Sequence, residues 1–229
     1  MIEAKTTVTS ITKSLLVIAL SLFASHIIIQ IGIFYFGFKK NWLEILNMDR
    51  EFNLPTLFAV FLFIVSSLLL KKISILKGKE SGSDWVLLSK IFLFLALDEG
   101  LQIHEIFIFP NLRPYIHPSL ASTWVIPYGL LLAIIGWRFK HFIRRLPKST
   151  SSKLLQSGFT YVLGAIGMEM VGSFAVRSEL IRLHSFEYGA ITGVEELLEV
   201  LGLILLINTL GHELIKRDGK QTFILSIKN

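Results

Sequence analysis

The chain of 229 residues has no cysteine and an unusually small share of charged side chains. Without cysteine it can form neither a disulfide framework nor a thiolate metal site. Charged residues make up 17% of the sequence, whereas a soluble domain carries roughly a quarter. That deficit, together with long apolar runs, excludes an ordinary cytosolic enzyme, a disordered tail and a coiled coil.

Apolar residues dominate instead: they make up 52% of the chain, and the mean hydropathy is +0.62. A helix needs about 20 apolar residues to cross a bilayer core of about 30 Å. We therefore predict an all-α, polytopic membrane bundle of about six transmembrane helices, forming one domain over residues 1–229. The predicted spans cover roughly residues 14–37, 54–75, 84–109, 122–139, 157–176 and 192–210.

The basic residues predict how this bundle is oriented in the membrane. With the N-terminus inside, the inner segments hold 16 of the 23 Lys and Arg residues, whereas the outer segments hold 6. Because Lys and Arg concentrate on the cytoplasmic side, we expect both termini in the cytoplasm. The formal net charge of +6 then favours anionic lipid at the cytoplasmic loops, above all along residues 138–153, and argues against nucleic acid.

Seven carboxylates lie where the predicted helices would place them in lipid. An ionised side chain at mid-membrane costs about 3 kcal/mol or more, so such residues usually face a bundle interior or a wet cavity. A rise of about 1.5 Å per residue puts the acids of three helices in the outer half of the membrane. We predict that they meet in one chamber. They are Asp98, Glu99 and Glu105 in the third span, Glu169 in the fifth, and Glu195, Glu196 and Glu199 in the sixth.

Helical periodicity and charge refine this prediction. At about 100° per residue, Asp98, Gln102 and Glu105 share one face of the third span. Three arginines occur in the loops that cap these helices, too few to neutralise seven carboxylates. Because unpaired buried charge is costly, some of the acids are expected to hold protons or a bound cation.

Two local patterns have structural interpretations. Thr192-Gly-Val-Glu195 fits a capping box at the start of the sixth span, which would leave Glu195 and Glu196 in its first turn. His26 and Gln30 are four residues apart in the first span and share a face, which is typical of hydrogen bonding between helices. Both patterns allow polar residues without a catalytic role.

A divalent metal centre is the most specific interpretation of the acidic residues, because carboxylates with an imidazole bind Fe, Mn or Zn. Such a site suggests a metal-dependent enzyme that acts on a lipid or lipophilic substrate. The sequence lacks the Glu-x-x-His spacing of helical di-metal proteins. A proton or cation transporter is the first alternative, and a structural or assembly protein with a polar packing cluster is the second. The predicted ligands are Asp98, Glu99, His104, Glu105, Glu169, Glu195, Glu196 and Glu199.

The same residues carry a resemblance. The run LDEGLQIHE, followed by GMEMVGS and then EELLEVLG, resembles a group of uncharacterised bacterial multi-pass membrane proteins. Their pattern combines Leu-Asp-Glu-x4-His-Glu with a later intramembrane Glu and with Glu-Glu-x-Leu-Glu. The resemblance covers the third to sixth spans and implies a bacterial inner-membrane protein. It implies no activity.

Overall fold

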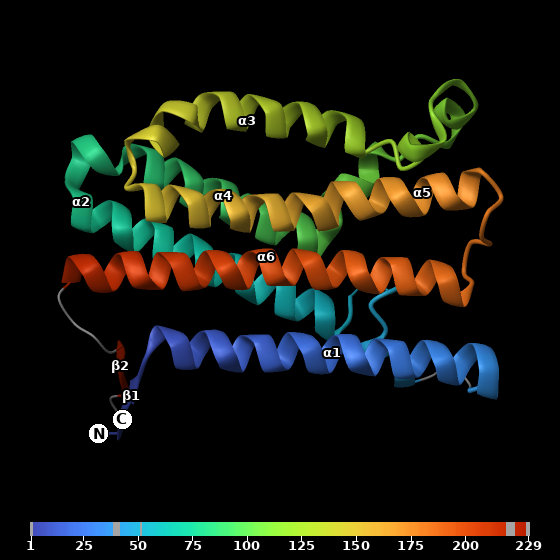
Figure 1. Cartoon of the computed structure of the whole chain (residues 1–229), viewed down its shortest axis with the longest axis horizontal. Helices are drawn as coiled ribbons and strands as arrows, with labels where there is room; N and C mark the ends of the chain where they lie inside the picture. The colour runs from blue at the N-terminus through green and yellow to red at the C-terminus, as the bar shows by residue number, and fades with distance from the viewer. Residues whose placement is uncertain (1, 39–41, 51, 219–222, 228–229) are drawn as a thin grey trace.

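A computed structural model describes residues 2–38, 42–50, 52–218 and 223–227. Nearly all of this part of the chain is helical, which confirms the all-α prediction, apart from one pair of short strands (Figure 1). The long helices are α1 (Val8–Phe36), α2 (Leu54–Leu101), α3 (Val125–Arg145), α4 (Lys148–Val162), α5 (Glu169–Arg177) and α6 (Phe186–Asp218). The shorter ones are η1 (Trp42–Leu46), η2 (Ile103–Phe107), η3 (Pro110–Tyr115), η4 (Pro118–Leu120) and the π-helical η5 (Leu163–Met168).

These helices form six rods that run back and forth along the long axis of the molecule (Figure 1). Two of the rods are arms of α2, which Gly78 divides by adopting φ 75° and ψ 176°. Only glycine takes up this conformation without strain, so the chain reverses there. The Ser67 hydroxyl then meets the Ser89 carbonyl from the facing arm at 2.7 Å. Another rod is the continuous series α4, η5 and α5.

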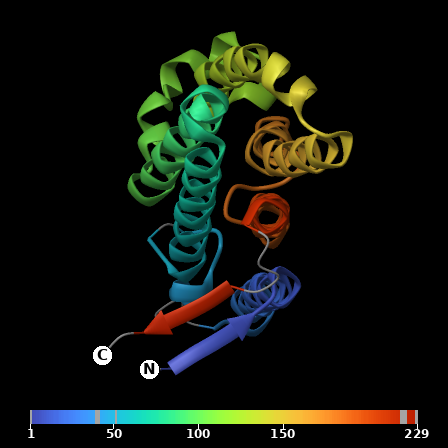
Figure 2. The ribbon, with the colours of Figure 1, turned by 90° about the vertical axis from the view of Figure 1, so that its left-hand side faces the viewer.

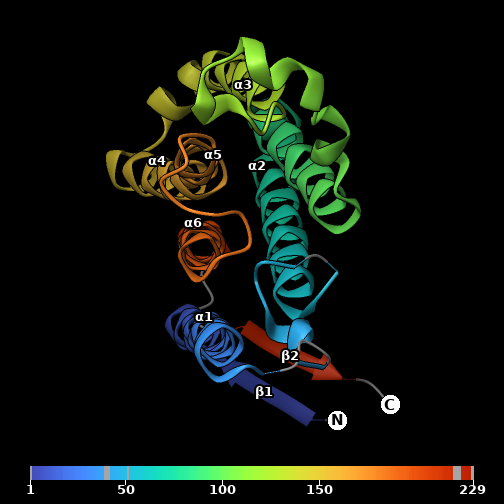
Figure 3. The same cartoon turned by 90° about the vertical axis from the view of Figure 1, so that its right-hand side faces the viewer.

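Helix α6 is the centre of the bundle and packs against α1, α2 and α4. Views along the rods show α6 between α1 on one side and α4 with α5 on the other (Figures 2 and 3). Glycines permit these close approaches. A Cβ atom on Gly193 would lie 2.6 Å from the His26 ring, and one on Gly202 would lie 2.7 Å from the Tyr161 backbone nitrogen. Small residues at helix contacts are typical of membrane bundles, where close packing replaces the hydrophobic effect.

Both ends of the chain lie at the same end of the bundle. Strand β1 (Ile2–Thr6) pairs antiparallel with β2 (Phe223–Ile227), and Ile2 lies opposite Ile227. The adjoining helix ends meet as well, because the Thr12 hydroxyl lies 3.2 Å from the Asn208 side-chain oxygen. Because the chain starts and finishes at the same end, it must run along the bundle an even number of times. We call this end the terminal end, and the opposite one the loop end.

Charged side chains at the terminal end connect neighbouring rods. Asp84 on the second arm of α2 forms ion pairs with Arg138 at 3.0 Å and with Arg145 at 3.2 Å, both from α3. Glu213 on α6 is buried; it pairs with Arg217 of the same helix at 2.6 Å and accepts a hydrogen bond from the Thr150 hydroxyl of α4 at 3.3 Å. The basic stretch after residue 138 therefore lies at the end that carries both termini.

Within the part of the chain that the structure describes, three helical segments are long and apolar enough to cross a membrane: Val8–Phe36, Leu54–Gly78 and Lys148–Arg177. Three of the six predicted spans, 14–37, 54–75 and 157–176, overlap these segments, and the other three have no counterpart among them. The sequence interpretation is wrong at two other places. The third predicted span runs to residue 109, whereas α2 ends at Leu101, because Gln102 adopts a left-handed backbone with φ 53°. The capping box is also wrong. Helix α6 begins at Phe186, so Thr192 lies inside it and donates a hydrogen bond to the Tyr188 carbonyl at 3.3 Å.

The Gly202 contact gives a stability test of the central packing. Changing Gly202 to alanine is expected to lower the free energy of unfolding by about 1–3 kcal/mol, because the new methyl group would overlap the α4 backbone. Gly158 is the matched control: a Cβ there would meet nothing within 4 Å, so alanine would stabilise its helix by about 0.5–1 kcal/mol. Thermal unfolding of the two purified variants measures the difference. Equal melting temperatures would contradict the packing.

Candidate functional site

The acidic residues of α6 face the neighbouring rod formed by α4, η5 and α5. Gly164 in η5 makes the approach possible. A Cβ atom at this position would lie 2.7 Å from the Glu195 carbonyl and 2.9 Å from Cγ of Glu199. The π-helical turn covers the Glu199 side chain directly. Single π-helical turns inside α-helices occur frequently at functional sites, because they displace side chains from the regular helical positions.

Glu199 is the centre of the acidic group. Its carboxylate accepts a hydrogen bond from the Tyr161 hydroxyl, which comes from α4. Glu196 and Glu195 on the same helix repel this carboxylate, and so does Glu99 from the second arm of α2. We call Glu99, Glu195, Glu196 and Glu199 the acidic cluster. The structure thus brings together four of the predicted site residues, from two helices.

Tyr161 was not among the predicted residues, although it holds the cluster in place. Its ring packs edge-on against Phe63 of α2, with 5.6 Å between the ring centroids. Gly202 leaves room for the Tyr161 backbone on the other side. The ring is therefore fixed between α2 and α6, and its hydroxyl is directed at Glu199. A tyrosine in an apolar run gives no sequence signal of this role, since aromatic residues are common in membrane helices.

Asp98 has a different role from the cluster, because protein groups already surround its carboxylate. Its Oδ1 accepts hydrogen bonds from the His104 backbone N–H at 2.8 Å and from the Tyr128 hydroxyl at 2.7 Å. Its Oδ2 lies 3.5 Å from Nδ1 of His104. The His104 ring in turn packs on Trp124, with 5.1 Å between centroids. Asp98 is buried and fixes the turn that follows α2.

Glu105 does not join the other acids. The predicted stripe of Asp98, Gln102 and Glu105 assumed one continuous helix, but α2 ends before these last two residues. Glu105 therefore lies on η2 and is exposed. Its assignment as a site residue is corrected on this ground.

Glu169 opens α5, on the loop-end side of the cluster. Its carboxylate accepts a hydrogen bond from the Ser173 hydroxyl at 3.2 Å, and this hydroxyl also accepts from the Ser122 backbone N–H at 3.3 Å. Tyr188 on α6 connects this region to the cluster, because its hydroxyl is within electrostatic reach of Glu169 and Glu195. Asp49, from the loop between α1 and α2, acts on the same hydroxyl. The acids therefore continue from the cluster towards the loop end.

A metal centre finds no support in this geometry. Within the described ranges, no group of three or more His, Asp or Glu side chains is arranged to hold one metal ion. The predicted ligands lie at four separate places instead: the acidic cluster, the Asp98–His104 pair, Glu169 beside Ser173, and the exposed Glu105. The Fe, Mn or Zn site thus stays a prediction.

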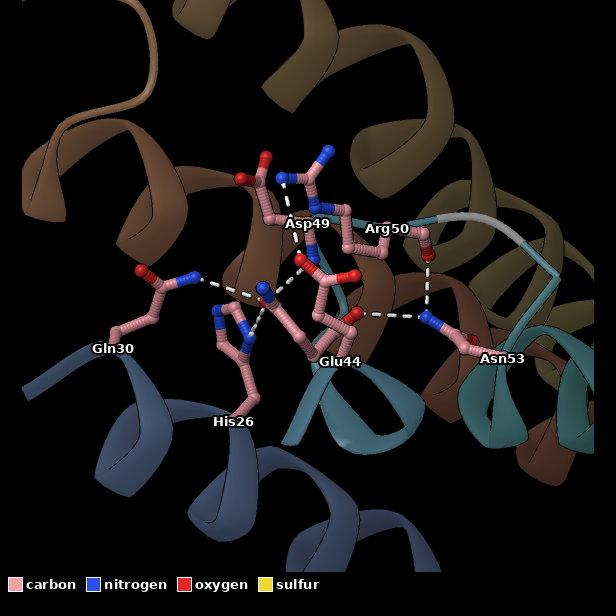
Figure 4. A network of polar contacts seen from close by, with 7 residues as sticks. His26, Gln30, Glu44, Asp49, Arg50 and Asn53 are labelled. Atoms are coloured by element: carbon pink, nitrogen blue, oxygen red, sulfur yellow. Dashed lines mark hydrogen bonds and ion pairs between the residues drawn. The ribbon is translucent and has the colours of Figure 1, made fainter. Parts of the chain in front are cut away.

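The predicted hydrogen bonding of His26 and Gln30 is confirmed. Nε2 of His26 donates to the Gly189 carbonyl of α6 at 2.8 Å, and Gln30 Nε2 donates to Oδ1 of Asn47 at 3.0 Å. Both side chains are fully enclosed. Figure 4 shows them pointing from α1 into the loop that leads to α2. The loop partner Asn47 was missed, since nothing in its sequence context marks a buried asparagine.

These features define a class of protein: a helical bundle with candidate membrane-spanning helices and an acidic interior. The chain matches the family described as a domain of unknown function, DUF8692, over residues 13–214, and it belongs to that family. The matched region begins within α1 and ends within α6, so it contains the acidic cluster and all the rods. No curated protein and no solved structure gives a significant match.

Proposed function

We propose that the chain is a six-span inner-membrane protein whose acidic cluster takes up and releases a proton, and that it works as a proton transporter. The observation that carries this proposal is the environment of Glu199. Its carboxylate accepts a hydrogen bond from the Tyr161 hydroxyl and faces three further carboxylates, Glu99, Glu195 and Glu196. Carboxylates grouped inside a membrane helix bundle are characteristic of proton pathways.

The electrostatics favour protons as the neutralising species. Carboxylates that share a low-dielectric site cannot all ionise, so the group holds at least one proton and titrates as a unit. A proton needs only one carboxyl oxygen and a hydrogen-bond partner, whereas a divalent metal needs several ligands that converge on one point. The described acids approach each other without such convergence. For this reason we prefer proton binding to the metal-dependent enzyme.

The proposed membrane placement rests on the ends of the bundle. The β1–β2 pair puts both termini at one end, as six crossings require. The basic residues Arg138 and Arg145 lie at that same end. Because positively charged loops stay in the cytoplasm, we place the terminal end there, in contact with anionic lipid, and the acidic cluster nearer the outer face.

Proton flux into liposomes tests this function. Liposomes that contain the protein and a trapped pH dye are expected to equilibrate a pH gradient faster than empty liposomes. Changing Glu199 to glutamine removes the titratable group with little change in shape, so the added flux is expected to fall to the empty-liposome rate. Glu105→Gln is the matched control, because Glu105 is exposed outside the cluster. The control is expected to keep the full flux.

Two other outcomes would replace the proposal. If liposomes with protein equilibrate no faster than empty ones, while added Mn, Fe or Zn raises the melting temperature only in the wild type, the metal-dependent enzyme is favoured. If there is no flux, no metal effect, and Glu199→Gln only lowers the melting temperature, the cluster serves helix packing.

A further inference from the structure

Residues from the segment 44–53 before α2, apart from residue 51, line a cavity of about 530 Å³ that is open to the surface at the loop end of the molecule. Its walls combine both signs of charge with apolar surface, a composition that differs from that of the acidic cluster. The lining residues are Glu44, Ile45, Asp49, Arg50, Phe52 and Asn53. Figure 4 shows the charged side chains gathered on the same side of the loop.

Two charged residues of the lining, Arg50 and Glu44, are held only loosely. Arg50 and Glu44 form an ion pair of 3.6 Å between nitrogen and oxygen, and both side chains remain about two-fifths exposed. Tight charge-assisted hydrogen bonds measure about 2.7–2.9 Å, so this pair is loose. Asp49 adds a second carboxylate, which leaves the lining with one net negative charge. Phe52 and Ile45 supply exposed apolar surface beside these groups.

Buried polar side chains support the described part of this loop around Asn47 and Asn53. Asn47 Oδ1 accepts from Gln30 Nε2 at 3.0 Å and from the Asp49 backbone N–H at 3.1 Å. The Asn53 side chain donates to the Asn47 carbonyl at 2.7 Å and caps α2 by accepting from the Thr56 N–H at 2.9 Å. The exposed charges therefore stand on a rigid support, as binding sites require.

The backbone at Phe52 indicates that this conformation is maintained against strain. Phe52 has φ 54°, a left-handed value that bulky residues avoid at a cost of about 1–3 kcal/mol. Its ring is 72% exposed, so burial of the ring does not offset the strain. Strained residues of this kind cluster at ligand clamps, where the surrounding structure holds them in place.

We propose that this cavity binds a zwitterionic group that carries a primary ammonium and a phosphate or carboxylate, as the headgroup of phosphatidylethanolamine does. Arg50 pairs with the anionic oxygens, and Asp49 with Glu44 receives the ammonium. The exposed Phe52 and Ile45 contact the carbon chain next to the headgroup. A lining with one net negative charge disfavours a purely anionic ligand. This site is distinct from the acidic cluster, and the proposal does not depend on proton transport.

Lipid binding by the purified full-length protein tests the site. Native mass spectrometry would compare phosphatidylethanolamine with phosphatidylglycerol, and a calorimetric titration would use soluble glycerophosphoethanolamine. We expect phosphatidylethanolamine to bind more tightly than phosphatidylglycerol. Arg50→Gln and Asp49→Asn are each expected to weaken binding about tenfold, the loss of one charge-assisted contact. Arg113→Gln, at another loop of the same end, is the control and should bind as the wild type does.

The soluble ligand identifies the source of the zwitterion. Saturable binding of glycerophosphoethanolamine that Arg50→Gln weakens about tenfold would support a soluble zwitterion, and binding of the lipid alone would support a membrane headgroup. Equal binding of both lipids, or binding that neither variant changes, would overturn the proposal. If Asp49→Asn does not fold, Arg50→Gln alone decides the test, because Arg50 is exposed and its side chain is outside the buried network.

Discussion

Replacing His26 with alanine is expected to lower the free energy of unfolding by about 3–5 kcal/mol, the upper range for a single buried side chain. The imidazole is fully buried where α1, α6 and the α1–α2 loop meet. Its Nε2 donates to the Gly189 carbonyl at 2.8 Å, and its Nδ1 accepts from the Met48 N–H at 3.1 Å. Alanine would leave both backbone groups without a partner and would leave a cavity as well.

The protonation state of His26 decides which loop contact it makes. Nδ1 lies 3.1 Å from the Met48 N–H and 3.0 Å from Asn47 Oδ1. The neutral ring accepts from Met48, and a protonated ring would instead donate to Asn47. Alanine removes both options, so the loop that carries the zwitterion cavity is expected to loosen together with the α1–α6 contact.

Thermal unfolding of the purified protein measures this effect. His141→Ala is the matched control, because the His141 side chain is exposed on α3, and its change should stay within about 0.5 kcal/mol. A His26→Ala protein that melts within a degree or two of the wild type would show that water replaces the imidazole, and the network would then not be structural.

The all-α class and the long apolar helices could be predicted from the sequence, because the apolar runs have the length of a membrane helix. The depth calculation placed seven acids from three helices in one chamber, whereas Glu99, Glu195, Glu196 and Glu199 approach one another and Asp98, Glu105 and Glu169 lie outside that group. A constant rise per residue is a sound assumption inside a regular helix, and the four acids of that group lie inside one. The prediction failed where the helix was not regular.

Glu105 and Asp98 show the physical reason for that failure. Whether a helix continues past Gln102 depends on one backbone conformation, and the turn that follows is stabilised by the hydrogen bond that the His104 backbone N–H donates to the Asp98 carboxylate. Hydrophobic periodicity does not report such contacts. The π-helical turn at η5 was missed for the same reason, since its extra residue depends on the approach of α6 at Gly164.

The two kinds of buried acid in this bundle are expected to respond differently to neutral replacement. Glu199 faces other carboxylates, so under the proposed function its proton is the element that matters. Asp98 faces hydrogen-bond donors, the His104 N–H and the Tyr128 hydroxyl, so its oxygen atoms contribute to stability as acceptors. An amide keeps an oxygen acceptor and loses the titratable proton. It therefore separates the two roles, whereas alanine removes both.

Changing Asp98 to alanine is expected to lower the free energy of unfolding by about 2–4 kcal/mol, because hydrogen bonds to a charged acceptor contribute about 1.5–3 kcal/mol each and the His104 N–H would be left unpaired. Asp98→Asn keeps an oxygen for that N–H and for the Tyr128 hydroxyl, so it should lose less than half as much. Glu105→Ala, on the exposed face of the same segment, should change stability by less than about 0.5 kcal/mol.

Proton flux measured on the same proteins completes the comparison. Asp98→Asn is expected to keep near wild-type flux in liposomes, in contrast to Glu199→Gln. If Asp98→Asn instead abolishes flux while its melting temperature is unchanged, Asp98 acts as an acid of the pathway. The Asp98–His104 contact of 3.5 Å would then carry the proton. If Asp98→Asn is as unstable as Asp98→Ala, the negative charge itself, rather than the acceptor geometry, holds the end of α2.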